Sequence, residues 1–301
     1  MSAPLVSVVI ATYNSARFVP TAVMSVLRQT LDDLELHVID DGSSDRTWEV
    51  LKPFASDKRF NYHYQPNRGQ ASAKNAGIRL SNGRFVAFLD ADDFWKPSKL
   101  ERQLPVFDGT DAGVVYSDVV YVDEGGRELK TRKRQYYQGW ITERLFIQNF
   151  VNFNSAVAKR ECFDRAGLFD ESLPMAIDWD LWLRISVLYP FAYLDEATFC
   201  YRIWPGQMSR NFRTRYECVM RIMQRFLASY PGVVRPRIVR KAWADTYTNL
   251  GRCHARDGAR ARALLCYLRA VSRDPTYLPA WAAMGRLAVP RWRPAVARRC
   301  G

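Results

Sequence analysis

Three short, mostly apolar runs constrain this 301-residue chain most, because each of them ends in a polar motif. The run at 6–11 is rich in β-branched residues and resembles a strand that is buried on both faces of a parallel sheet, and the runs at 34–39 and 84–89 are also expected to be strands. Helical patterns separate them, as in βαβ units. Right-handed crossovers place the carboxyl ends of such strands on one edge, where open α/β sheets bind ligands. We therefore expect an α/β fold with a site where the polar motifs meet.

The rest of the pattern fits the same architecture. Further strands are expected at 60–65 and 154–158, and a strand pair at 114–117 and 119–122 that closes on Asp123-Glu-Gly-Gly. Periodic apolar residues and caps predict a helix at 15–30 with Ser15 as its cap, and helices at 47–55, 70–80, 161–166 and 178–189. Alternation of this kind predicts a mostly parallel sheet.

The strand at 84–89 leads into Asp90, Asp92 and Asp93. Three carboxylates within four residues repel one another and raise each other's pKa, so a fold gains nothing from clustering them without a cation. Mg²⁺ and Mn²⁺ prefer oxygen ligands and usually take one or two carboxylates together with substrate phosphates. An acidic surface loop is the alternative. The cluster predicts a divalent metal held against the diphosphate of a nucleotide-activated substrate, and hence a transferase.

Four segments occur in order between residues 6 and 210, namely VSVVIATYN, VIDDGSSDRT, FLDADD and DWDLWLR. In this combination the chain resembles the family 2 glycosyltransferases of the GT-A fold. The resemblance implies a Rossmann-like mixed sheet and a catalytic domain over residues 1–212. It implies an inverting enzyme that uses Mn²⁺ or Mg²⁺ and moves a sugar from a nucleoside diphosphate, UDP being favoured, to a glycan or lipid-linked glycan, as in cell-surface polysaccharide synthesis.

The resemblance also implies roles for single residues. The second carboxylate of the Asp40–Asp41 turn is expected to contact the base, although such a turn is also good loop chemistry. A helix start and a cation at Lys74 suit a diphosphate, whereas a solvated helical lysine is nearly as good a reading; the family more often has arginine there. The implied nucleotide-binding residues are Ala11, Thr12, Tyr13, Asp41, Asn67, Gly69, Lys74, Asp90, Ala91, Asp92 and Arg202. The implied metal ligands are Asp92 and Asp93, one of which is expected on the metal and the other on the ribose.

Asp178, at the start of a helix, is implied as the general base that deprotonates the acceptor hydroxyl, and it can also cap the helix. The family usually has Glu-Asp here, but Ile177 precedes this aspartate. Asp180 is the fallback base, about 200° around the helix. Trp179 and Trp182 either stack on an acceptor sugar or, more commonly for such residues, pack in the core.

The segment 199–209 resembles the part of the family that closes over the diphosphate. Arg202 and Ser209 are the expected phosphate partners. Many members have histidine, sometimes a metal ligand, where Trp204 stands here. Because tryptophan cannot coordinate a metal, the acidic cluster is expected to provide nearly all of the protein's metal binding.

The C-terminal part, residues 213–301, is predicted to be a basic helical segment. Residues 231–301 have 15 Lys and Arg against 3 Asp and no Glu, which is +12 of the chain's +13. One and a half tetratricopeptide-like repeats are indicated, because adding the 34-residue period to Tyr247 and Gly251 gives Trp281 and Gly285. The other matching positions are Leu250, Ala263, Tyr267, Ala270 and Pro275. Since so few repeats cannot fold alone, this segment should pack on helices from 213–245 or on the catalytic domain.

Parts of the sequence are compatible with functions other than a transferase. A non-catalytic, transferase-like scaffold would act through the helical repeat surface. Nucleic-acid binding is disfavoured, because the basic residues are not interleaved with aromatics. Peripheral contact with an anionic membrane fits better, and a merely solvated basic face is the equal alternative. The best candidate patch for the membrane contact is Arg291, Trp292, Arg293, Arg298 and Arg299.

Location and assembly are expectations of the same kind. No signal peptide or membrane span is evident, which predicts a cytoplasmic protein, here at the inner face of the plasma membrane. The helical segment offers a surface for an oligomer. Six scattered cysteines without a CxxC pair are expected to be reduced.

Overall fold

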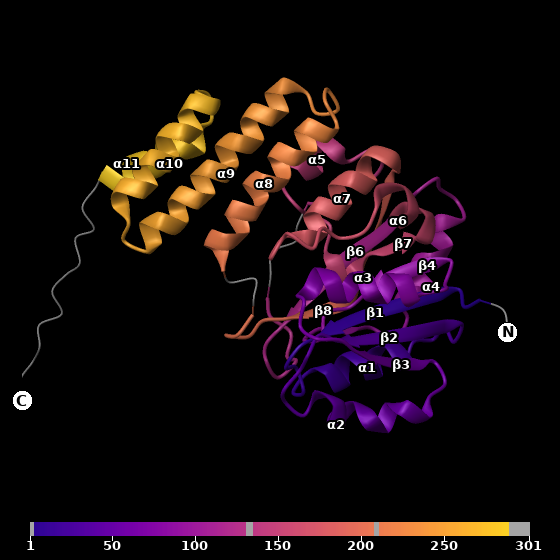
Figure 1. Ribbon diagram of the computed structural model, residues 1–301. Helices are drawn as coiled ribbons and strands as arrows, with labels where there is room; N and C mark the ends of the chain where they lie inside the picture. Colours follow the sequence, from indigo (N-terminus) through magenta and orange to yellow (C-terminus); the bar gives the residue numbers. More distant parts are fainter. Residues whose placement is uncertain (1–2, 131–134, 208–210, 289–301) are drawn as a thin grey trace, which may run out of the picture.

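The computed structural model describes residues 3–130, 135–207 and 211–288 as a mixed sheet with helices on both faces and an array of helices at one side (Figure 1). The eight strands lie in the order β3-β2-β1-β4-β7-β6-β8-β5. Their bounds are β1 Val6–Thr12, β2 Leu34–Asp40, β3 Phe60–Tyr64, β4 Phe85–Phe88, β5 Phe94–Trp95, β6 Val114–Val122, β7 Val157–Lys159 and β8 Phe191–Arg202. The predicted α/β fold with a mixed sheet is confirmed.

The parallel half of the sheet consists of β1 to β4, as the spacing of the apolar runs predicts. Val6 of β1 lies opposite Leu34 of β2 and Phe85 of β4, and both pairings are parallel. The central strand is buried over nearly its whole length, which explains its continuous run of apolar residues. All three strands therefore end at the same edge of the sheet.

The other half differs from the sequence prediction. The expected strand pair at 114–122 is wrong, because β6 is one strand whose register with β8 shifts around Asp118. The amide of Val119 donates to the Asp118 carboxylate at 2.8 Å, and the amide of Ser117 donates to the Ser155 hydroxyl. These side-chain acceptors take two donors out of the regular ladder, as at a β-bulge. The long strand β8 was expected only in part, as a closing segment.

Helices cover both faces of the sheet. The helices of the first 190 residues are α1 Val19–Leu27, α2 Thr47–Leu51, α3 Gln70–Leu80, α4 Lys99–Gln103, α5 Thr142–Ile147, α6 Arg160–Ala166 and α7 Ile177–Leu188, and the 3₁₀ turns are η1 Lys52–Ser56, η2 Leu104–Phe107 and η3 Phe153–Ser155. The predicted cap at Ser15 is wrong. Its hydroxyl bonds to the Tyr13 carbonyl, and α1 begins four residues later with Pro20 in its first turn, a favoured position for proline.

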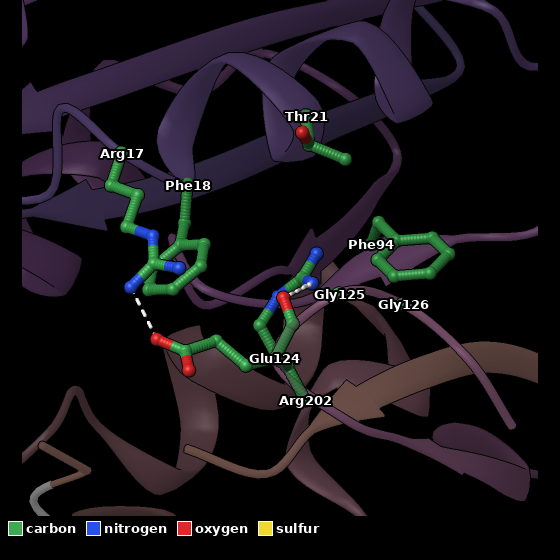
Figure 2. Close-up of a pocket in the computed structure, with 8 residues that line it drawn as sticks. All are labelled: Arg17, Phe18, Thr21, Phe94, Glu124, Gly125, Gly126 and Arg202. Carbon is green, nitrogen blue, oxygen red and sulfur yellow. Dashed lines mark hydrogen bonds and ion pairs between the residues drawn. The ribbon is translucent and has the colours of Figure 1, made fainter. Parts of the chain in front are cut away.

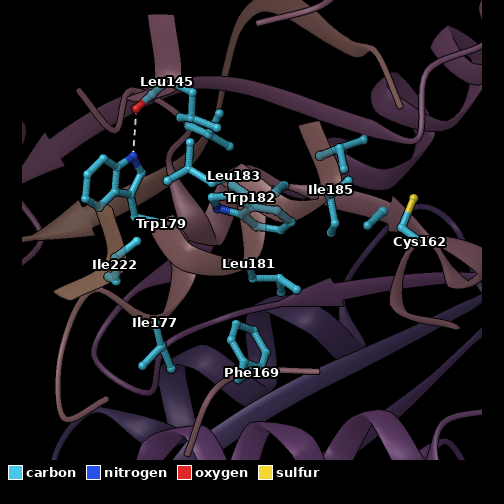
Figure 3. Packing of buried hydrophobic residues seen from close by; sticks show 14 of the residues in the cluster. Leu145, Cys162, Phe169, Ile177, Trp179, Leu181, Trp182, Leu183, Ile185 and Ile222 are labelled. Carbon is cyan, nitrogen blue, oxygen red and sulfur yellow. Dashed lines mark hydrogen bonds between the residues drawn. The ribbon is translucent and has the colours of Figure 1, made fainter. Parts of the chain in front are cut away.

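The core lies in two layers, one on each face of the sheet. One layer joins α1 and α4 to the sheet, and the larger one joins α3, α6 and α7 to it. Figure 3 shows the centre of the larger layer, where α7 packs its apolar residues against the sheet and α5. Trp182 is fully buried there, and Trp179 donates its indole N–H to the Leu145 carbonyl at 2.7 Å. Of the two readings of these tryptophans, core packing is the correct one.

The C-terminal helices extend from this layer. They are α8 Phe212–Ser229, α9 Pro236–Arg256, α10 Arg260–Arg273 and α11 Leu278–Ala288, and they lie side by side in Figure 1. Ile222 and Phe226 of α8 and Trp243 of α9 belong to the same core layer as α7. The helices α10 and α11 pack in turn on α9, so the repeats have the neighbouring helices that were expected for them. The patch expected at 291–299 and Cys300 lie outside the described residues. The other five cysteines are free thiols.

No helix in the described part of the chain is both long and apolar enough to cross a membrane.

Substitutions of Gly251 and Gly285, which lie 34 residues apart, are expected to have opposite effects on stability. A Cβ on Gly251 would lie 2.5 Å from the Tyr267 ring, whereas a Cβ on Gly285 would meet no atom of the described part of the chain within 4 Å. Gly251→Ala should therefore lower the free energy of unfolding by about 1–3 kcal/mol through overpacking. Gly285→Ala should raise it by about 0.5–1 kcal/mol, because alanine favours the helix. Urea denaturation of both variants checks this, and shifts of the same sign would contradict the packing described.

Candidate active site

Segments that leave three neighbouring strands form the floor of the candidate active site. β2, β1 and β4 are adjacent and parallel, and they end at Asp40, Thr12 and just before Asp90. The amide of Asp41 donates to the Thr12 carbonyl at 2.9 Å, which ties the ends of β2 and β1 together. The prediction that these polar motifs meet at one edge of the sheet is confirmed.

Lys74 lies at the centre of the site. This residue of α3 has a side chain only 5% exposed, and its ammonium is 2.9 Å from Asp90 Oδ1 and 4.2 Å from the centre of the Phe153 ring. Its charge also acts to lower the pKa values of Asp92 and Asp178. A buried ammonium within electrostatic reach of three carboxylates is not the solvated helical lysine that was the alternative reading.

Asp92 is half-buried and connects the acidic cluster to the segment after β8. Its Oδ2 accepts a hydrogen bond from Trp204 Nε1 at 2.8 Å. Burial and the neighbouring charge of Asp90 raise the pKa of Asp92. Trp204 thus holds a carboxylate oxygen through its indole N–H.

Asp93 turns inward and differs from the prediction. It is 1% exposed, its Oδ1 accepts from the amide of Arg202 at 2.8 Å, and its Oδ2 accepts from Asn154 Nδ2. Burial raises its pKa well above the usual range. Since both oxygens bind protein groups and the side chain is buried, Asp93 fixes the end of β8 to the acidic loop, and its contacts do not favour the metal or ribose role expected for it.

Asp178 stands in the first turn of α7, as the sequence predicts, and the charge of Lys74 reaches it. Asn149 Nδ2 donates to its Oδ2 at 2.8 Å. Burial raises the pKa of Asp178, while Asn149 and the charges of Lys74 and Arg215 act in the opposite direction. The fallback base Asp180 lies elsewhere, because Arg184 pairs with its Oδ2 at 2.7 Å on the buried side of the helix.

Asp41 organises the loop between β3 and α3. Its Oδ1 accepts from Gln65 Nε2 at 2.7 Å and from the amide of Arg68 at 3.0 Å, and its Oδ2 accepts from the amide of Gly69 at 2.7 Å. Gly69 has a φ of +88°, a conformation in which glycine is unstrained. Asn67 lies in the same loop, directly against Gly42, where a Cβ would come within 2.8 Å of the Asn67 nitrogen.

The residues expected around the base differ in exposure. Tyr13 is exposed at the mouth of the site, and Ala91 is buried in the core layer under it. Ala11 is half-buried at the end of β1. The hydroxyl of Thr12 is buried and has no hydrogen-bond partner among the described residues. A buried polar atom without a partner is unusual in a native fold and marks a position that a ligand can satisfy.

Arg202 lies below the acidic loop. Its guanidinium donates to the Asp92 and Glu124 carbonyls at 2.9 and 2.7 Å and stands 5.0 Å from the Phe18 ring. It lines an open pocket of about 460 Å³, shown in Figure 2. The ion pair of Arg17 and Glu124 also lines this pocket. Ser209, the other expected phosphate partner, lies outside the described residues.

Comparison with known proteins decides the family. Residues 7–165, more than half of the chain, match the model of the family described as Glycosyl transferase family 2. This chain is a family 2 glycosyltransferase. It is therefore an enzyme, which disfavours the alternative of a non-catalytic scaffold, and the predicted GT-A fold is confirmed as well.

This glycosyltransferase matches only part of the length of its relatives. Chondroitin synthase of Escherichia coli is 31% identical over 209 residues, which is 68% of this chain and 29% of that protein. An uncharacterized glycosyltransferase of Nostoc sp. is 41% identical over 200 residues, 64% of this chain and 60% of that protein. The transferase thus spans less than two thirds of the length of these relatives.

Two solved structures share the fold of the transferase. Staphylococcus aureus TarS 1–349, in complex with UDP-GlcNAc, has a TM-score of 0.63 at 18% identity, with 93% of this chain and 90% of that chain covered. The mannosyltransferase PcManGT from Pyrobaculum calidifontis, in complex with GDP-Man and Mn²⁺, has a TM-score of 0.63 at 20% identity, with 95% and 80% covered. At these identities the likeness shows the fold alone.

Two asparagines of the transferase site were not anticipated. Asn149 holds Asp178, and Asn154 accepts the amide of Asp90 at 2.9 Å through Oδ1 while its Nδ2 donates to Asp93. Both lie in the stretch before β7, which carries no polar motif of its own. Their signal in the sequence is the run Asn149-Phe-Val-Asn-Phe-Asn154, whose amides are unusually dense for a segment between buried elements.

The contacts of Asp93 lead to a prediction about stability. In Asp93→Asn one side-chain atom can still accept from the Arg202 amide, but the new NH₂ group would face the NH₂ of Asn154. Two buried donors then oppose each other, and the free energy of unfolding should fall by about 1–3 kcal/mol. Asp92→Asn should change it little, because asparagine Oδ1 can accept from Trp204. Thermal denaturation of the two variants measures the difference, and an unchanged midpoint for Asp93→Asn would contradict the structural role.

Proposed function

We propose that this family 2 glycosyltransferase moves a sugar, with inversion, from a nucleoside diphosphate to a hydroxyl group of a glycan or lipid-linked glycan, as in cell-surface polysaccharide synthesis. The observation that carries the proposal is the ion pair between the buried Lys74 and Asp90, with Asp178 within electrostatic reach of the same ammonium. A fixed cation beside a carboxylate base is suited to a reaction in which a hydroxyl loses a proton while a diphosphate leaves. UDP is proposed as the carrier, in line with the UDP-GlcNAc complex of TarS.

The nucleotide would bind where β1 and β2 end. Thr12 offers a buried hydroxyl, and Tyr13 an exposed ring beside it. Asp41 accepts three hydrogen bonds from the protein, and a carboxylate has room for about four, so one acceptor site is left for the imide N–H of a base. Asn67 and Gly69 complete this side through the loop that Asp41 holds in place.

The acidic residues fit a divalent cation if it is shared with the substrate. Among the described residues, no group of three or more His, Cys, Asp or Glu side chains is arranged to enclose a metal ion. Asp92 and Asp90 each bind a protein side chain through one oxygen. Burial and the charge of Asp90 raise the pKa of Asp92, and a bound cation would lower it again. One or two carboxylates plus substrate phosphates are the usual set for Mg²⁺. Asp92, assisted by Asp90, would hold Mn²⁺ or Mg²⁺, which would neutralise charge on the leaving diphosphate.

The chain's own residues then divide the remaining work. Asp178 accepts the proton of the acceptor hydroxyl, whose oxygen forms the new bond to the anomeric carbon as the bond to the diphosphate oxygen breaks. Asn149 orients the carboxylate by donating to Asp178 Oδ2. Lys74 offsets the negative charge of the diphosphate. Arg202 keeps the acidic loop and the end of β8 in register and, as expected from the sequence, would approach the phosphates from below.

Donor identity can be tested by thermal shift. The full chain is heated with UDP-, GDP- or dTDP-sugars in the presence of Mn²⁺, and the proposal expects UDP-sugars to raise the melting temperature most. A larger rise with GDP-sugars would overturn UDP as the carrier while leaving a transferase. No rise with any nucleotide sugar would contradict the proposed function itself.

Location is a separate part of the proposal. The enzyme is proposed to work in the cytoplasm at the inner face of the plasma membrane, where the +12 charge of residues 231–301 would attract acidic lipid. Sedimentation with anionic liposomes, with and without residues 289–301, tests this. Removal of these residues should reduce the bound fraction, and identical partitioning rejects the idea.

The contact between Asn149 and Asp178 leads to a prediction about pH. A general base acts in its ionised form, so the rate should rise with pH through the pKa of Asp178, which burial raises above that of an ordinary aspartate. The hydrogen bond from Asn149 favours the ionised form, and its loss in Asn149→Ala should raise this pKa further. The acid limb of kcat should therefore move to higher pH. The pH–rate profile of both proteins checks this, and an unmoved limb would contradict the role of Asp178.

A further inference from the structure

Helix α11, at the end of the helical array farthest from the sheet in Figure 1, is apolar on two faces. Among its eleven residues, Arg286 is the one charged residue. One face is buried, with Ala280 and Ala283 packed against α9 and α10. The opposite face carries Leu278, 75% exposed, and Trp281, 49% exposed, followed at helical spacing by Ala282 and Gly285. A helix that is apolar all round is normally covered on all sides.

The chain itself shows what covers such a face. Gly251 of α9 is buried, because the Tyr267 ring and the Ala263 carbonyl of α10 lie against it; a Cβ there would be 2.5 Å and 3.1 Å from them. Gly285 occupies the same repeat position on α11, 34 residues later, and a Cβ there would meet none of the described residues within 4 Å. The missing side chain of Gly285 thus leaves a notch on α11 like the one at Gly251, which receives α10. No helix of the described residues occupies the notch at Gly285.

The two helices α10 and α11 also expose apolar residues and carry a positive charge. On α10, Leu264, Leu265 and Leu268 are 41–57% exposed. Residues 260–288 contain five arginines and one acidic residue, Asp274, which gives a net charge of +4. Arg260 reaches the carboxyl end of α11, where it donates to the Leu287 carbonyl, and Arg286 directly follows the notch.

We propose that the outer face of α11 is a docking surface for an acidic amphipathic helix of a partner protein. By the template of α10, this helix presents an aromatic residue to Gly285 with a small residue four positions before it, as Tyr267 and Ala263 do at Gly251. The acidic residues of the partner helix pair with arginines such as Arg260 and Arg286. A second copy of this chain is disfavoured, because it would bring two arginine-rich segments together. A lipid surface has no side chain to fill a notch of this shape.

The test uses a defined probe and the full chain. The probe is a labelled peptide of residues 258–274 in which Arg260, Arg262, Arg269 and Arg273 are replaced by glutamate, so that the docking residues stay and the charge is reversed. Fluorescence anisotropy should show saturable binding to the wild-type chain that weakens at high salt. Gly285→Leu fills the notch and should weaken binding at least tenfold. This variant should remain folded, because Gly285 has open space and leucine favours a helix.

Two controls define the site, and several outcomes would overturn it. A peptide that also carries Tyr267→Ala, and the original basic peptide, should both bind at least tenfold more weakly than the acidic probe. Failure of the acidic probe to bind, or equal binding by wild type and Gly285→Leu, rejects the proposal. Binding only after removal of residues 289–301 would show that this chain covers its own face. Self-association, or vesicle binding, that disappears in Gly285→Leu would assign the face to a second copy or to lipid instead.

Discussion

Asp178→Asn is expected to lower kcat by about 10²–10⁴, the usual contribution of a positioned general base. The carboxylate lies in the first turn of α7 within electrostatic reach of Lys74, and Asn149 holds one of its oxygens. Asparagine has the same shape and can keep the contact with Asn149 through its oxygen, so the loss should be chemical and not structural. The apparent KM for the donor should change little. Initial rates of nucleoside diphosphate release measure both constants.

Asp108→Asn is the matched control for this variant. Asp108 is an exposed aspartate at the end of η2, remote in the sequence from every site residue, and its loss should leave kcat unchanged. A kcat for Asp178→Asn within a few-fold of wild type would show that another group accepts the proton. Asp180 would not be the next choice, because it is paired with Arg184.

Asp92→Asn is expected to remove metal-dependent turnover, by at least about a thousandfold. The proposed metal has few protein ligands, so each carboxylate oxygen matters, and the loss of several kcal/mol of charge stabilisation corresponds to such a factor. The fold should persist, because the asparagine oxygen can accept the hydrogen bond of Trp204. Turnover in Mn²⁺ is the measurement, with the melting temperature as a check on folding.

A chelator provides the control for this second variant. EDTA should reduce the wild-type rate to the level of Asp92→Asn, and it should have no further effect on the variant, because both changes remove the same interaction. A wild-type rate that survives EDTA would show that the reaction proceeds without the metal. A large additional effect of EDTA on the variant would place the metal on other ligands.

Most of the parallel half of the fold could be predicted from the sequence, because its signals are local. β1, β2 and β4 are short, mostly apolar runs, and each is followed directly by residues that form the site. The topology of parallel strands then brings Thr12, Asp41 and Asp90 together without any knowledge of side-chain contacts. The same local reasoning located α3 and α7, and with them Lys74 and Asp178.

What could not be predicted depends on contacts between distant segments. β8 mixes polar and apolar residues because its two neighbours pair with it unequally. β6 pairs along its length, whereas β5 pairs only with Phe199 and Cys200, so the pattern of β8 is not that of a buried strand. Asp93 looks the same as Asp92 in the sequence, and only the Arg202 amide and Asn154 make it structural. Lys74 is buried because Asp90 and Phe153 meet it from other elements.

The most direct test of the central claim is a calorimetric titration of UDP into the full chain, with Mn²⁺ and with EDTA. If the acidic edge beside Lys74 is a nucleoside diphosphate site, UDP should bind in Mn²⁺ at least tenfold more tightly than in EDTA, and Asp92→Asn should abolish that difference. Equal affinity in Mn²⁺ and EDTA, or no binding of UDP or GDP in either, would contradict the account.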